Sequence, residues 1–139
     1  IKENNLIKNK KIQFLNYNIK NKNLYTKLQK LISNKSKKIV YARFFLHALT
    51  NTEIKTFFLI AKKLIKKNGS IFIEYRTEKD KKNKKIFKNH YRNFINPNNL
   101  ENILIKFNLK SIFFKEGKGM AIYKKEDAYV ARHIIKLEK

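Results

Sequence analysis

One segment of the sequence, residues 39–77, has the pattern of a strand, a helix and a second strand. The apolar run IVY at residues 39–41 is short and β-prone. The helix that follows is indicated by apolar residues at intervals of three and four, namely Ile54, Phe57, Phe58, Ala61, Leu64 and Ile65. Residues 70–75, SIFIEY, then read as a strand buried on both faces. The segment therefore predicts a βαβ crossover between parallel strands.

Both ends of the predicted helix are marked. Thr50 and Glu53 have the spacing of a capping box at its start. Asn68-Gly69 provides the left-handed stop that is common at helix ends. This helix is therefore the clearest element in the sequence.

The crossover also predicts where ligands bind. Parallel strands place their carboxyl ends at the same edge of a sheet, and open α/β sheets bind ligands at that edge. The polar and aromatic side chains that the sequence brings there are Tyr41, Arg43, His47, Glu74, Tyr75 and Arg76.

Before this crossover, the sequence has one more strand pattern and one more helix pattern. Residues 12–15 read as a strand, and Leu24, Leu28, Leu31 and Ile32 repeat at helical spacing. The order from residue 12 to residue 77 is then strand, helix, strand, helix, strand, which is typical of a parallel α/β sheet.

The carboxyl-terminal third predicts one more helix and an antiparallel hairpin. A helix begins near Pro97, with an inner face formed by Leu100, Ile103, Leu104 and Phe107. Two strands, 111–115 and 120–124, flank a glycine-containing turn at 116–119. The last segment, 126–139, either extends the second strand or covers the sheet edge as a further strand or helix.

Length and charge limit the class of protein. The chain has 139 residues and 42% hydrophobic content, so we expect one domain, 1–139, with a buried core. The formal net charge is +24. Lysine is spread through every segment beside abundant Asn and Ile, as in proteins of AT-rich genomes, so two interpretations are open: a solvated surface, or a surface that follows a polyanion.

Several kinds of site are disfavoured. The sequence has no cysteine, which excludes disulfides, thiolate metal sites and a cysteine nucleophile. His47, His90 and His133 lack the spacing of metal ligands. No apolar run is long enough to span a membrane and no signal peptide opens the chain, so we expect a cytoplasmic protein.

Four motifs, in order, resemble a known family. They are YARFFLHAL at 41–49, NG-IFIEYRT-KD within 68–80, HYRNFI at 90–95 and EGKGMAIYKKEDAYVAR at 116–132. This order is similar to a bacterial branch of the class I S-adenosylmethionine-dependent methyltransferases. Its members carry a YxRFFLHA segment after the fourth strand, an EFRT-like end to the fifth, a HYRR-like segment and a glycine hairpin followed by ED-x-x-x-x-R.

The resemblance implies a Rossmann-like methyltransferase fold, with a mostly parallel sheet and a terminal antiparallel hairpin. It also implies S-adenosylmethionine as cofactor. The family's glycine-rich turn after the first strand is missing, because Gly69, Gly117 and Gly119 do not lie between an amino-terminal strand and a helix. We therefore expect a domain truncated at its amino terminus, lacking the first strands. The strands at 12–15 and 39–41 would then pair directly or leave a bare edge.

The resemblance places the cofactor against four residues. Asn18 falls where the family has an acidic residue near the adenine, although a turn-forming Asn at a strand end is an equal alternative. Tyr41, Ala42 and Arg43 end the fourth strand against the methionine part of the cofactor. Arg43 can pair with its carboxylate or with an acidic acceptor.

The expected catalytic residues are His47, Glu74, Arg76, His90, Tyr91 and Arg92. His47 is either a general base or a structural histidine. Glu74 needs a partner because an unpaired buried carboxylate is costly, and the candidates are Arg43, Arg76 and Arg92. A structural ion pair explains Glu74 as well as catalysis does. The segment His90-Tyr91-Arg92 either closes over the acceptor or forms a capped loop.

These expectations lead to a methyltransferase for a small-molecule or carbohydrate-like acceptor. The alternative within enzymes is an RNA methyltransferase, which the charge favours. A second alternative is a non-catalytic basic module that binds nucleic acid or a partner subunit.

Overall fold

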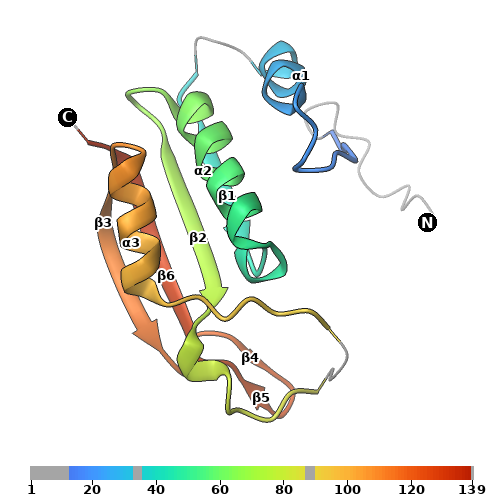
Figure 1. The fold of residues 1–139 in the computed structure, drawn as a ribbon, viewed down its shortest axis with the longest axis vertical. Helices are drawn as coiled ribbons and strands as arrows, with labels where there is room; N and C mark the ends of the chain where they lie inside the picture. The colour runs from blue at the N-terminus through green and yellow to red at the C-terminus, as the bar shows by residue number, and fades with distance from the viewer. Residues whose placement is uncertain (1–12, 33–35, 87–89, 139) are drawn as a thin grey trace.

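The computed structural model describes residues 13–32, 36–86 and 90–138 (Figure 1). Its main feature is a four-stranded sheet in the order β1-β2-β6-β3, formed by β1 (Ile39–Arg43), β2 (Ser70–Arg76), β6 (Val130–Leu137) and β3 (Leu109–Gly117). β1 and β2 are parallel, whereas β6 is antiparallel to both of its neighbours. The fold is therefore α/β with a mixed sheet.

The predicted crossover is confirmed. β1 and β2 are joined by α2 (Asn51–Ile65), whose first turn has the predicted capping box. The Glu53 N–H donates to Thr50 Oγ1 over 3.3 Å, and the Thr50 N–H donates to Glu53 Oε2 over 2.8 Å. The apolar side of α2 lies in the main core with Ile71, Ile73 and Tyr75 of β2.

The predicted helix stop at Asn68-Gly69 is wrong. α2 ends at Ile65, and the residue with the left-handed φ of 48° is Lys66. Gly69 serves packing instead: a Cβ there would lie 2.5 Å from the Lys38 carbonyl oxygen and 2.6 Å from the Ile65 Cβ. The glycine lets the start of β2 pass close to the end of the helix.

The predicted hairpin pairs the wrong segments. β3 does not pair with residues 120–124 but with β6, so the carboxyl-terminal segment is an inner strand between β2 and β3. The glycine turn instead leads into a separate small hairpin, β4 (Ile122–Tyr123) with β5 (Glu126–Asp127). Gly119 adopts a φ of 76°, and its N–H donates to Asp127 Oδ1 over 2.8 Å. The glycine pattern therefore marks the turn that leads into the β4–β5 hairpin, not a turn between two strands of the main sheet.

The amino-terminal strand is also wrong within the described residues. Residues 13–15 have no regular structure, and the Phe14 side chain is 84% exposed. Residue 12 lies outside the described part of the chain. The helix predicted from Leu24 is confirmed as α1 (Leu24–Leu31), which packs against α2 rather than beside a strand (Figure 1). In the described part of the chain, β1 therefore has a bare edge.

The helices lie on one face of the sheet. Figure 1 shows α2 and α3 (Pro97–Lys106) on the same side, α2 over β1 and β2 and α3 over β3 and β6. α3 begins as predicted, with Asn96 capping the Asn98 N–H over 2.8 Å. None of the described helices is long and apolar enough to cross a membrane. The opposite face of the sheet leaves Ile39, Tyr41 and Phe113 exposed.

Candidate functional site

The carboxyl ends of β1 and β2 lie side by side, as the crossover predicts. Arg43, the last residue of β1, is in register with Glu74 of β2. The chain then turns sharply at Phe44, which has a φ of 52° and donates its N–H to the Glu74 carbonyl over 2.8 Å. This turn leads into the short 3-10 helix η1 (Leu46–Ala48), which carries His47.

Glu74 is held between two arginines. Arg43 Nε lies 2.8 Å from Glu74 Oε1, and Arg132 Nε lies 2.6 Å from Glu74 Oε2. Glu74 is 5% exposed, whereas both guanidinium groups reach solvent. Arg43 was one of the three expected partners, and Arg132 was not anticipated. Both carboxylate oxygens are therefore neutralised on the open face of the sheet.

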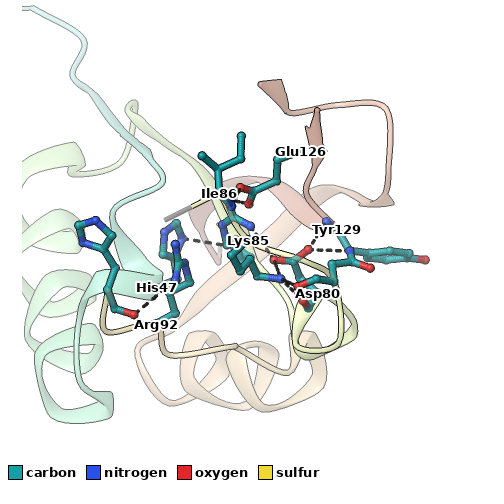
Figure 2. A network of polar contacts seen from close by, with 10 residues as sticks. His47, Asp80, Lys85, Ile86, Arg92, Glu126 and Tyr129 are labelled. Carbon is teal, nitrogen blue, oxygen red and sulfur yellow. Dashed lines mark hydrogen bonds and ion pairs between the residues drawn. The ribbon is translucent and has the colours of Figure 1, made fainter. Parts of the chain in front are cut away.

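Arg76 belongs to a second group of charges, of which Figure 2 labels Asp80, Lys85 and Glu126. The two terminal nitrogens of Arg76 bind Asp80 Oδ2 at 2.7 Å and Glu126 Oε1 at 2.5 Å. Lys85 Nζ lies 3.0 Å from the same Asp80 oxygen. Arg76 thus pairs with these two carboxylates rather than with Glu74, and it joins the end of β2 to the β4–β5 hairpin.

Backbone donors complete this second group. The Tyr129 N–H donates to Asp80 Oδ1 over 2.8 Å, and the Ile86 N–H donates to Glu126 Oε2 over 2.9 Å (Figure 2). Burial alone would raise the pKa of Asp80 and of Glu126. Hydrogen bonds from these backbone groups and from Arg76 outweigh burial, so both pKa values lie below the ordinary value. Both carboxylates are ionised at neutral pH.

Phe44 lies between the two charge groups. Its ring centroid is 5.2 Å from Arg43 Cζ and 5.7 Å from Arg76 Cζ, which is cation–π distance. The His47 ring meets it edge-on, with 5.5 Å between centroids. One aromatic side chain therefore contacts an arginine of each group and the candidate histidine.

His47 has the features of a structural histidine. The Arg76 N–H points at Nδ1 over 3.4 Å, and the His47 carbonyl accepts the Asn93 N–H over 2.7 Å. Burial, reinforced by Arg76 and Arg92, lowers the pKa of His47 to about 4. The imidazole is neutral at pH 7 with its Nδ1 lone pair facing the backbone, which weakens its candidacy as a general base.

The HYRNFI segment packs along the same edge. Asn93 Nδ2 donates to the Leu49 carbonyl over 3.0 Å and to Asn51 Oδ1 over 2.9 Å, and the Ile95 N–H donates to the Arg76 carbonyl over 3.2 Å. Tyr91, at 63% exposure, projects to solvent. His90 and Arg92 lie next to each other, with Arg92 Nη1 3.4 Å from the His90 carbonyl oxygen.

Of the four residues expected at the cofactor, Tyr41 and Arg43 share one face of the sheet, whereas Asn18 and Ala42 lie elsewhere. Asn18 Oδ1 accepts the Lys20 N–H over 2.9 Å, so the alternative of a turn-forming asparagine accounts for it. Ala42 faces the core under α2, whereas Tyr41 is 70% exposed on the opposite face beside Arg43. These assignments stay predictions.

Tyr75, expected at the sheet edge, is instead a core residue. It is fully buried, and its hydroxyl lies 3.0 Å from His133 Nε2. His133 Nδ1 is 2.9 Å from Ser111 Oγ, so both ring nitrogens are hydrogen-bonded across three strands. Burial lowers the pKa of His133 to about 4 and raises that of Tyr75. This chain of contacts stabilises the sheet interior.

The residues that sequence reasoning missed at the edge are Phe44, Asp80, Lys85, Glu126 and Arg132. All but Lys85 lie inside the four quoted motifs. A signal was therefore present, but pairing between residues up to 58 positions apart cannot be read from local spacing.

Comparison with known proteins gives no family model that matches the chain and no matching curated sequence. Within the described residues, no group of three or more metal-ligating side chains is gathered in one place. The geometry of the edge is thus the basis for assigning a function.

Proposed function

We propose that the chain carries the acceptor side of an S-adenosylmethionine-dependent methyltransferase acting on a small-molecule or carbohydrate-like acceptor. One observation carries the proposal: the four motifs behind the family resemblance, dispersed over 92 positions from residue 41 to residue 132, meet at one sheet edge. Arg43 and Arg132 share Glu74, Arg76 binds Asp80 and Glu126, and Asn93 anchors the HYRNFI segment to η1.

Methyl transfer requires few catalytic groups beyond the residues gathered at this edge. Methyl transfer from a sulfonium is an in-line displacement, which mainly requires alignment of the reacting groups. A hydroxyl acceptor also requires a base. His90 is the better candidate for that base, because it is exposed while His47 Nδ1 faces a backbone N–H. Arg43 binds Glu74 through Nε and its side chain is half exposed, so its guanidinium group suits a ligand carboxylate.

A neighbouring cavity fits a hydroxyl-rich acceptor. A hollow of about 540 Å³ between α2, α3 and the 93–96 segment is lined by Asn51, Asn93, Asn96, Asn99 and Asn102. Side-chain amides both donate and accept hydrogen bonds, as sugar hydroxyls require. Asn99 and Asn102 are exposed, so their amides are accessible to a ligand.

The described residues supply only part of a cofactor site. None of the three glycines lies in a strand-to-helix turn, so the backbone cradle of the family is not formed by this chain. We therefore expect weak binding of S-adenosylmethionine or its demethylated product by this chain.

Calorimetry tests the proposal. S-adenosylhomocysteine titrated into the chain, and into the longest open reading frame that contains it, is expected to give saturable heat that Arg43→Gln reduces. Lys30→Gln, on the exposed side of α1 and away from the hollow between α2 and α3, is the matched control. Absence of saturable heat in both proteins at millimolar ligand would overturn the methyltransferase assignment.

A further inference from the structure

The face of the sheet opposite the helices carries a row of apolar side chains. Strand register aligns Tyr41 of β1, Phe72 of β2, Ile134 of β6 and Phe113 of β3 across the sheet. Tyr41 is 70% and Phe113 46% exposed. With strands about 4.8 Å apart, the row extends roughly 14 Å. Three of its four members are aromatic.

A charged row lies beside the apolar one. Two register positions further toward the carboxyl ends of β1 and β2, and therefore on the same face, the sheet aligns Arg43, Glu74, Arg132 and Lys115. Glu74 is buried between the two arginines, while Lys115 is exposed. A hollow of about 400 Å³ includes members of both rows, among them Tyr41, Arg43 and Phe113.

The net positive charge of this face favours a negatively charged ligand. Within the four-stranded sheet, Glu74 is the only acidic side chain of the described strands on this face, since Glu116 of β3 is in register with Ala131 on the helix side. The row therefore has three positive charges against one negative. A second copy of the chain is disfavoured as occupant, because each molecule has a formal charge of +24.

We propose that this open face binds single-stranded nucleic acid, with bases stacked on Tyr41, Phe72 and Phe113 and phosphates along Arg43, Arg132 and Lys115. Aromatic side chains on a four-stranded sheet stack about two or three bases, and neighbouring cations follow the backbone. A duplex cannot use such a platform because its bases are already stacked. The proposal does not require methyl transfer, although it shares Tyr41 and Arg43 with the predicted cofactor contacts. It gives a location to the polyanion-binding surface that the net charge of +24 left open as one interpretation.

Fluorescence anisotropy with labelled 12-nucleotide oligo(U) and oligo(dT) tests the proposal. Tyr41→Ala is expected to weaken binding about 5- to 150-fold, the effect of losing one stacked base. Tyr41→Phe should retain affinity. Tyr123→Ala is the matched control, because Tyr123 is 55% exposed but belongs to the separate β4–β5 hairpin. Equal affinities for the two oligonucleotides would show that the face contacts bases and phosphates only. A higher affinity for oligo(U) would show that it also contacts the ribose hydroxyl.

Salt dependence tests the basic row. Lys115→Gln should reduce the slope of log affinity against log salt by about 0.7, and Lys55→Gln on α2 should not change it. The proposal is overturned if Tyr41→Ala binds like the parent chain, if Tyr123→Ala loses as much as Tyr41→Ala, or if a duplex of the same length binds equally well. Circular dichroism of each variant verifies folding. Calorimetry with S-adenosylhomocysteine on the parent chain and on Lys115→Gln, a residue without a role in the proposed methyl transfer, reports the methyltransferase assignment separately.

Discussion

Glu74 shows how single residues constrain this fold. A buried carboxylate is costly unless it is paired, and here each of its oxygens binds a different arginine. Arg43 and Arg132 come from β1 and β6, the two neighbours of β2. The triad therefore ties together three strands that are distant in sequence.

Glu74→Gln is expected to lower the free energy of unfolding by about 2 kcal/mol. Breaking a fully buried pair costs more, but the two arginines left behind are half exposed and stay hydrated. Urea unfolding measures the change. Arg43→Gln removes one of the two partners and should cost less. Parental stability in Glu74→Gln would mean that the triad contributes nothing to the fold.

Stability should fall as the pH is lowered from 7 to 5. The pKa values of His47 and His133 are about 4 in the folded chain, below the ordinary 6.5. The unfolded state then binds more protons between these values, so stability is present above pH 6.5 and is lost toward pH 4. The loss is up to about 2 kcal/mol per histidine between pH 7 and pH 5.

Urea titrations at pH 7, 6 and 5 measure this dependence, and His133→Gln should reduce it by the share of one histidine. Constant stability across this range in the parent chain would contradict the burial of the two imidazoles.

At the scale of elements, the junction between α2 and β2 depends on close packing. Gly69→Ala would place a Cβ against backbone and Cβ atoms of Lys38 and Ile65, which cannot move aside as a flexible side chain can. We expect a loss of about 1–3 kcal/mol in urea unfolding. Gly117→Ala is the matched control, because nothing lies within 4 Å of its added Cβ. Equal stability of the two variants would show that the junction tolerates a side chain.

Elements defined by local signals were predictable, and those defined by distant pairing were not. The Thr50 capping box and the apolar spacing of α2 lie within a few residues of one another, so the sequence predicted that helix correctly. The strand that pairs with β3 is β6, which follows the β4–β5 hairpin in the sequence. The glycine turn instead predicted pairing with the nearer segment at 120–124. At the site, Arg43 as a partner of Glu74 was predicted, whereas Arg132 required knowledge of strand order.

At the scale of the whole molecule, the two crossovers of the described chain run in one direction, and β6 then returns between β2 and β3. Both crossovers, β1-α2-β2 and β2-α3-β3, proceed toward the same side of the sheet, so their helices share one face (Figure 1). The molecule thus has a covered face that holds the core, an open aromatic and basic face, and a carboxyl edge where the four motifs meet. The two proposed ligands share Tyr41 and Arg43, where the open face meets this edge, and otherwise contact different residues.

Nuclear magnetic resonance most directly tests the claim that this edge is a ligand site. In a ¹⁵N-labelled chain titrated with S-adenosylhomocysteine, the account predicts saturable shifts at the amides of residues 41–44 and 76–80, with the amides of α1 unchanged. Shifts absent at millimolar ligand, or confined to residues away from the carboxyl ends of β1 and β2, would contradict it.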